Sequence, residues 1–231
     1  MPVPPTTTLR RDPGPAMPRV LVEAAVDSVA AGLAAVLAGA DRLELCRDLS
    51  VGGLSPAPQW IRRLKGEVGV PVFAMVRPRP GSFCFSPEEL SRCRKEIHAL
   101  HLAGADGVVT GVLTAAGRVD EPATGELVDA AGSFPVTFHR AFDELADSIE
   151  AMEQLIGLGV TRVLTAGGPG RALEGVEILR QLVDRAGDRI RVMAGGGVRG
   201  DHVAQLVALT GVSEVHLAGV RRGGPDGLGD P

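Results

Sequence analysis

The sequence predicts an α/β fold, a single (β/α)8 barrel of the TIM type with eight parallel strands. Eight short apolar runs alternate with amphipathic stretches between two polar ends. The runs are continuously apolar, which is typical of parallel strands buried on both faces. Together they occupy about 200 residues, the lower size limit of such a barrel. An open doubly wound sheet is the alternative, but it favours a glycine-rich turn after its first strand, and residues 24–28 contain no glycine.

The expected strands and helices follow one another in regular order. We expect strands at 20–25, 42–46, 70–76, 107–110, 135–139, 162–165, 189–194 and 214–217. We expect helices near 28–38, 57–66, 87–103, 121–131, 147–158, 172–186 and 200–210. Ser86 offers an N-cap before Pro87 and two acidic residues, and Asp120 precedes Glu121 and a proline in a similar way. Glycines at the helix-to-strand corners fit helix C-caps: Gly39, Gly104, Gly159 and Gly211.

The two ends of the chain lack the pattern of the barrel. Residues 1–18 are rich in proline and threonine and are expected to form a disordered N-terminal tail. Residues 221–231 are expected to form a flexible C-terminal tail, which leaves 19–220 as the barrel domain. The Arg10-Arg11 pair lacks the apolar segment that a twin-arginine export signal requires. Met17 is a candidate for the true start, because the first segment expected to be structured begins two residues later at Arg19.

Composition excludes several classes of protein. The chain has 231 residues and a net charge of −4, which counts against a nucleic-acid-binding domain. No apolar stretch reaches the roughly 18 residues of a membrane span. Three cysteines are too few, and odd in number, for a disulfide framework. They favour a reducing compartment, so we expect a cytoplasmic protein.

Polar residues gather where six of the eight expected strands end. Active sites of such barrels lie at the carboxyl ends of the strands. The two-residue period places Glu44 with Cys46, and Glu214 with His216, on shared faces. The expected catalytic set is Glu23, Glu44, Arg77, His139, Asp143 and His216. This set can bind an anionic small molecule and perform acid–base chemistry. The alternative for Glu23, Glu44 and Arg77 is an ion-pair network that only fills the barrel.

A glycine run after the seventh strand is a candidate anion site. Gly195, Gly196 and Gly197 precede a helix, and backbone N–H groups at such a position favour a negative ligand. Phosphate sites in barrels often use the loops after strands seven and eight. Arg79 is expected to contribute to anion binding with this loop. A tight turn is the alternative interpretation.

The cysteines fall into two groups. Cys93 lies at helical spacing with apolar residues and is expected in the core. Cys46 ends the second strand and Cys84 follows the third, so these thiols could meet above the barrel. Two thiolates suit a cuprous ion, Cu+. The spacing is not a Cys-x-x-Cys motif, so the pair is a hypothesis.

Several segments together resemble the copper homeostasis protein CutC family. They include VEAAVDS at 22–28, VFAMVRPRPGSFCFS at 72–86, PVTFHRAFD at 135–143 and VMAGGGV at 192–198. The resemblance covers nearly all of residues 19–218. It implies a (β/α)8 barrel in the cytoplasm with a link to copper tolerance, in which cysteines are the proposed cuprous ligands. The family's shared polar residues match the catalytic set given above.

The sequence departs from the family pattern at one position that bears on copper. Many relatives have a cysteine where this chain has Ala25, so that position cannot pair with Cys46. The resemblance favours a copper-handling protein that binds copper through Cys46 and Cys84. The alternative is a lyase- or isomerase-type enzyme for a small anionic or phosphorylated substrate. In that enzyme Glu23 or Glu44 is the base, His139 or His216 the acid, and Arg77 the anion clamp. Either protein could form a homodimer.

Overall fold

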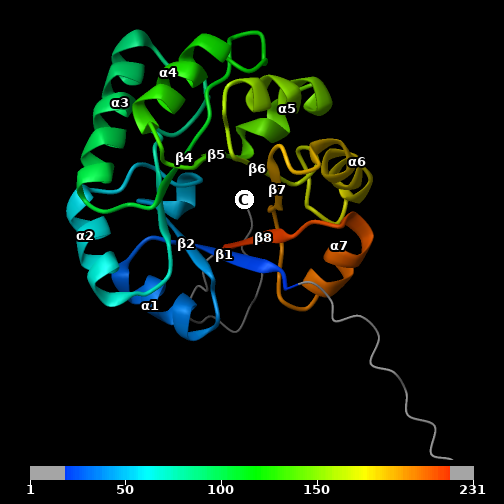
Figure 1. The fold of residues 1–231 in the computed structure, drawn as a ribbon, viewed down its shortest axis with the longest axis horizontal. Helices are drawn as coiled ribbons and strands as arrows, with labels where there is room; N and C mark the ends of the chain where they lie inside the picture. The colour runs from blue at the N-terminus through cyan, green and yellow to red at the C-terminus, as the bar shows by residue number, and fades with distance from the viewer. Residues whose placement is uncertain (1–18, 219–231) are drawn as a thin grey trace, which may run out of the picture.

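The computed structural model describes residues 19–218, which form a closed barrel of eight parallel strands (Figure 1). The strands follow chain order around the barrel, and the first and last lie side by side, blue and red in the figure. Seven α-helices surround the strands. The predicted (β/α)8 fold is confirmed. The expected tails, residues 1–18 and 221–231, lie outside the described residues. Residues 219–220 of the expected barrel lie outside them as well.

The observed elements match the expected ones to within a few residues. The strands are β1 Leu21–Val26, β2 Arg42–Leu45, β3 Val72–Met75, β4 Gly107–Thr110, β5 Val136–Phe138, β6 Arg162–Thr165, β7 Arg191–Ala194 and β8 Glu214–Ala218. The α-helices are α1 Val29–Leu37, α2 Pro58–Glu67, α3 Pro87–Leu102, α4 Glu121–Ala131, α5 Ser148–Gly157, α6 Val176–Ala186 and α7 Val203–Thr210. Two short 3-10 helices, η1 Leu49–Val51 and η2 Arg140–Glu144, follow β2 and β5. No helix in the described range is long and apolar enough to cross a bilayer.

Side-chain alternation separates the outer core from the barrel interior. Leu43 and Leu45 on β2 belong to the apolar cluster that includes Ile61 of α2. Cys46, which follows β2, packs instead with Phe73 and other inward side chains. The predicted period of two is therefore confirmed on β2, and it aims Glu44 into the barrel together with Cys46.

Local capping interactions explain where the helices begin. The Ser86 side chain accepts a hydrogen bond from the Glu89 N–H, and the Glu89 side chain accepts one from the Ser86 N–H. This reciprocal pair is a capping box. Asp120 accepts a hydrogen bond from the Ala123 N–H at the start of α4. Both starts lie where the sequence predicts them.

A buried ion-pair network fills the amino-terminal half of the barrel. Arg42 is paired with Glu23 and with Glu214, and Glu214 also accepts two hydrogen bonds from Arg162. Both guanidinium groups stack over Phe73, at 5.0 and 5.5 Å from its ring centroid. Arg42 and Arg162 are not among the site residues predicted from the sequence. The signal was available for Arg42, which stands two residues before Glu44 and so shares its inward face.

The Phe73 ring occupies the space that a side chain at position 107 would fill. A Cβ at that position would lie 2.7 Å from the Phe73 ring, which is too close for van der Waals contact. We expect Gly107→Ala to lower the free energy of unfolding by about 1–3 kcal/mol, because a packed core resists added volume. Gly66→Ala is the control. Gly66 lies within α2 with no atom near its missing Cβ, so alanine there should leave stability unchanged or raised. Urea unfolding measures both, and equal stabilities would contradict the prediction.

Candidate functional site

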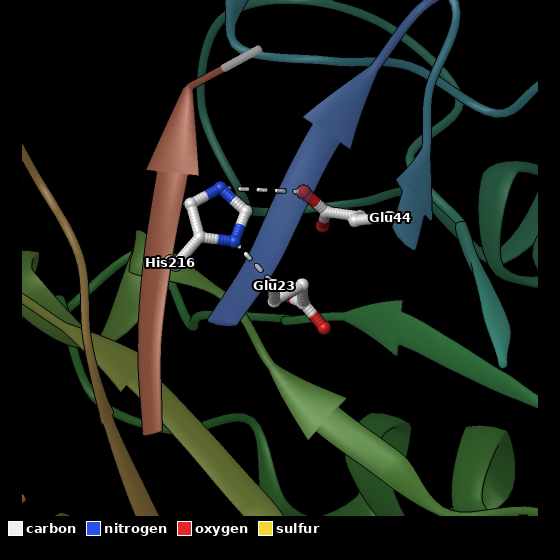
Figure 2. Close-up of side chains that lie close together, drawn as sticks. All are labelled: Glu23, Glu44 and His216. Carbon is white, nitrogen blue, oxygen red and sulfur yellow. Dashed lines mark hydrogen bonds and ion pairs between the residues drawn. The ribbon is translucent and has the colours of Figure 1, made fainter. Parts of the chain in front are cut away.

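Three neighbouring strands bring two carboxylates and an imidazole together above this network (Figure 2). Strand β1 pairs with both β2 and β8, in a register that sets Glu23 beside His216 and Ala25 beside Glu44. The His216 Nδ1 lies 2.8 Å from Oε1 of Glu23. Its Nε2 lies 3.6 Å from Oε2 of Glu44. The imidazole therefore stands between two carboxylates, as Figure 2 shows.

Glu23 is the permanently ionised member of this group. It is fully buried, and burial alone would raise its pKa. The hydrogen bond and charge of His216, together with Arg42, outweigh burial and lower the pKa of Glu23 to about 2. An ionised Glu23 accepts the Nδ1–H of His216 and holds the ring in place.

Glu44 is the member of this group whose ionisation changes near neutral pH. Burial raises the pKa of Glu44 to about 7, with Glu23 adding to the effect and His216 opposing it. Burial lowers the pKa of His216, but its hydrogen bond to Glu23 and the charges of Glu44 and Glu23 together raise it above the usual value. The Oε1 atom of Glu44 is buried and has no hydrogen-bond partner within residues 19–218. One oxygen of Glu44 thus remains available to a ligand.

The same three residues have a donor arrangement that fits a metal ion. One ligand atom from each of Glu23, Glu44 and His216 lies within 4.8 Å of the others. A carboxylate that fixes the far nitrogen of a histidine is a common arrangement around bound metals. The cluster can therefore exchange protons or accept a cation.

Arg77 and His139 lie on the β3 and β5 side of the same end of the barrel. Arg77 donates to the carbonyl oxygens of Val51 and Gly81, at 2.8 and 2.9 Å. The His139 Nδ1 accepts a hydrogen bond from the Ala141 N–H. Burial, with a contribution from the Arg77 charge, lowers the pKa of His139 to about 3. His139 is therefore neutral at physiological pH, and it is His216 rather than His139 whose ionisation suits an acid.

Asp143 is held by contacts at the end of β6, and its catalytic role stays a prediction. It accepts hydrogen bonds from Oγ1 of Thr165 and the N–H of Ala166, and it pairs with Arg140. These contacts tie η2 to the end of β6. The sequence places Asp143 near the mouth correctly, but it could not predict how the turn after β5 would direct this carboxylate.

The structure does not bring Arg79 to the glycine loop. Arg79 pairs with Glu89 and donates to the carbonyl oxygens of its own loop, including that of Cys84. Arg140 and Arg171 both lie beside the loop, and a Cβ on Gly197 would lie 3.3 Å from Cγ and Cδ of Arg171. A Cβ on Gly196 would lie 3.1 Å from the Arg140 Cζ. The positive φ values of Gly196 and Gly197, 92° and 65°, favour glycine at both positions.

Glu214 shares a face with His216 as predicted, but it lies at the start of β8, away from the end of the barrel where active sites occur. It is the first residue of that strand and belongs to the ion-pair network with Arg42 and Arg162. The ion-pair network that the sequence offers as the alternative for Glu23, Glu44 and Arg77 thus exists in this barrel with Glu214 as a member, which the sequence did not predict. That alternative describes Glu23 in part, because Glu23 contacts both Arg42 and His216.

The two cysteines of the expected copper pair have contrasting surroundings. Cys46 is buried, and burial raises the pKa of its thiol well above the usual value, with Glu44 and Glu23 adding to the effect. Cys84 is exposed on the loop after β3. Cys93 is buried in the outer core as predicted. The pairing of Cys46 with Cys84 stays a prediction.

Comparisons with known proteins agree on one family. The model of the CutC family matches residues 20–221. A CutC family protein from Pasteurella multocida is 43% identical over 198 residues, covering 86% of this chain and 81% of the relative. The human copper homeostasis protein cutC homolog is 41% identical over 198 residues, covering 86% and 72% of the two chains.

Solved structures give the same result. A CutC crystal structure from Streptococcus agalactiae matches with a TM-score of 0.79 and 31% identity, over 85% of this chain and 97% of that one. A phosphoribosylanthranilate isomerase from Pyrococcus furiosus, 14% identical with a TM-score of 0.60 over 88% and 90% of the chains, shares the fold alone. The chain belongs to the CutC family.

Proposed function

We propose that this protein is an enzyme of the lyase or isomerase type that transfers protons at a small anionic ligand in the barrel mouth. One observation carries the proposal: His216 stands between Glu23 and Glu44, and Glu44 keeps a buried oxygen without a partner. In this scheme Glu44 is the general base and His216 the general acid. Glu23 positions the imidazole.

The energetics of the cluster support this proposal. A buried polar atom without a partner costs about 1–3 kcal/mol, and a ligand that hydrogen-bonds to Glu44 would remove that cost. General bases work best when their pKa lies near the operating pH. The raised pKa of Glu44, about 7, meets that condition. The cluster also lies at the end of the barrel where active sites of this fold occur.

The experiment is an exchange assay in D2O. A panel of small hydroxy and keto compounds, carboxylated or phosphorylated, is incubated with the protein, and deuterium incorporation is measured by mass spectrometry. We expect at least one compound to exchange a carbon-bound proton with the wild type and not with Glu44→Gln. Compounds that bind but exchange no faster than without protein would count against the proposal.

A second proposal is that the protein binds a cuprous ion at Cys46. The Cys46 Sγ and the Met75 Cε lie 2.9 and 3.4 Å from the point a Cβ on Gly53 would occupy, so two soft side chains meet there. Thiolate and thioether sulfur suit Cu+. The human relative is named a copper homeostasis protein. Against this, burial raises the pKa of Cys46 and disfavours the thiolate.

Anaerobic titration of Cu+ against a competing chelator tests this second proposal. We expect tight binding to be lost in Cys46→Ser and kept in Cys93→Ser, the control with a buried thiol outside the barrel interior. Loss in Cys84→Ser as well would support the thiol pair predicted from the sequence. Loss in Met75→Leu with retention in Cys84→Ser would make Met75 the second ligand. Equal binding by all variants would show that Cu+ does not bind at Cys46.

A further inference from the structure

Arg77 is a buried cation that forms no ion pair among the described residues, and the charge of Glu144 offsets its own only in part. Only 6% of its surface is exposed, and its Nη atoms donate to the main-chain oxygens of Val51, Gly53 and Gly81. Within residues 19–218 no carboxylate forms an ion pair with it, and its Nε–H has no hydrogen-bond partner. Buried charges in proteins are normally paired, so the site favours a negative group from outside the described fold.

His139 supplies a second buried donor without a partner. Its Nδ1 accepts the Ala141 N–H, which assigns the hydrogen of the neutral ring to Nε2. The Nε2–H is buried and finds no partner in the part of the chain that the structure describes, and the whole residue is 4% exposed. Burial lowers the pKa of His139 to about 3, so this donor persists at neutral pH. Gly111 makes room for the ring, since a Cβ there would lie 2.6 Å from it.

The two donors lie near each other, since both side chains contact the Phe83 ring. The Arg77 Cζ lies 4.8 Å from the centroid of the Phe83 ring, and the His139 ring centroid lies 4.7 Å from it. Arg77 follows β3 and His139 follows β5, and both strands pair with β4. The positive charge of Arg77 also acts on His139. Two N–H groups without partners among the described residues thus lie around one ring, together with a positive charge that Glu144 offsets only in part.

We propose that Arg77 and His139 bind an oxyanion group of a small ligand through Nε–H and Nε2–H. Two N–H donors match the two oxygens of a carboxylate, whereas a phosphoryl group presents more oxygens than this pair can satisfy. The oxyanion would neutralise Arg77 and place the rest of the ligand towards the other strand ends. This inference deepens the proposed function. The role of the oxyanion in a reaction rests on that proposal, whereas its binding by Arg77 and His139 does not.

Binding of simple anions tests the inference directly. Uniformly 15N-labelled protein is titrated with acetate and with inorganic phosphate, against chloride at matched ionic strength, and the backbone amides of Gly111 and Ala141 are followed by NMR. We expect saturable shifts with acetate that chloride does not reproduce. Tighter binding of acetate would identify a carboxylate, and tighter binding of phosphate a phosphoryl group. No saturable shift with either anion would overturn the inference.

Two substitutions of His139 separate its donor from its structural role. His139→Asn keeps an acceptor at the start of η2 for the Ala141 N–H and removes the outer donor. His139→Gln keeps a donor near the position of Nε2. We expect His139→Asn to weaken acetate binding about tenfold or more, as loss of a hydrogen bond to a charged group predicts, and His139→Gln to weaken it less. Equal affinity in the wild type and His139→Asn would contradict the assignment.

Arg77→Lys provides an independent variant if the histidine substitutions disturb folding. It keeps the charge and removes the Nε–H, so acetate binding should weaken while the amide spectrum stays dispersed. Unchanged affinity in a folded Arg77→Lys would also overturn the inference. Because anion binding is measured without turnover, retained acetate binding without any exchange activity would count against the proposed function alone. Lost acetate binding with retained exchange would count against the oxyanion site alone.

Discussion

Replacing Glu44 by glutamine is expected to slow deuterium exchange by about 10²–10⁴-fold, the usual contribution of a general acid or base. Glutamine keeps the shape of the side chain but cannot accept a proton. The neighbouring Glu23–His216 hydrogen bond does not involve Glu44 and should survive. The measurement is the exchange rate of the best compound of the panel at saturation, with folding checked by circular dichroism.

The pH dependence of the wild type gives a second readout of the same prediction. The base form of Glu44 appears above its pKa of about 7, so the rate should rise through neutral pH. It should fall again where His216 loses its proton, at a pH above the usual histidine value because its pKa is raised. The two groups interact, so both limbs belong to the pair.

A matched carboxylate elsewhere provides the control for this prediction. Glu126 lies on α4 at the outside of the barrel, where it pairs with Arg94. Glu126→Gln should leave both the exchange rate and its pH profile unchanged. A rate in Glu44→Gln equal to that of Glu126→Gln would show that Glu44 is not the base.

The central residues of the site could be predicted because barrel geometry links strand position to location. Residues at the ends of parallel strands meet at one end of the barrel, and a period of two says which of them point inward. Those two rules were enough for Glu23, Glu44 and His216. The barrel closes between β1 and β8, so Glu23 and His216 meet although they are 193 positions apart in the chain.

Depth within the barrel and the direction of loop side chains could not be predicted in this way. Glu214 and His216 share a face, yet only the register between strands sets one in the ion-pair network and the other beside Glu44. The directions of Asp143 and Arg79 depend on turns whose hydrogen bonds involve distant residues or their own loops. The strand pattern indicates neither the depth of a side chain in the barrel nor the direction of a side chain in a loop.

The largest expected effect on stability comes from Glu214. Replacing Glu214 by glutamine is expected to lower the free energy of unfolding by about 3–5 kcal/mol. The substitution removes the negative partner of a buried ion pair and leaves the positive partner buried without it. Arg42 would keep its pair with Glu23, but Arg162 has no second carboxylate partner among the described residues. Urea unfolding at neutral pH measures the change. The double variant Glu214→Gln, Arg162→Met should recover part of the loss, since it removes the unpaired charge.

The pH dependence of that loss distinguishes an electrostatic cause from poor packing. Burial would raise the pKa of Glu214, but Arg162 and Arg42 outweigh it and lower the pKa below the usual value of 4.5. A carboxylate with a lowered pKa stabilises the fold above its unfolded-state pKa, and this contribution disappears as pH falls through the folded-state value. The stability gap between the wild type and Glu214→Gln should therefore shrink in acid. A gap that stays constant down to the acid transition would mean that glutamine disturbs packing around Phe73, rather than leaving Arg162 without its charge partner.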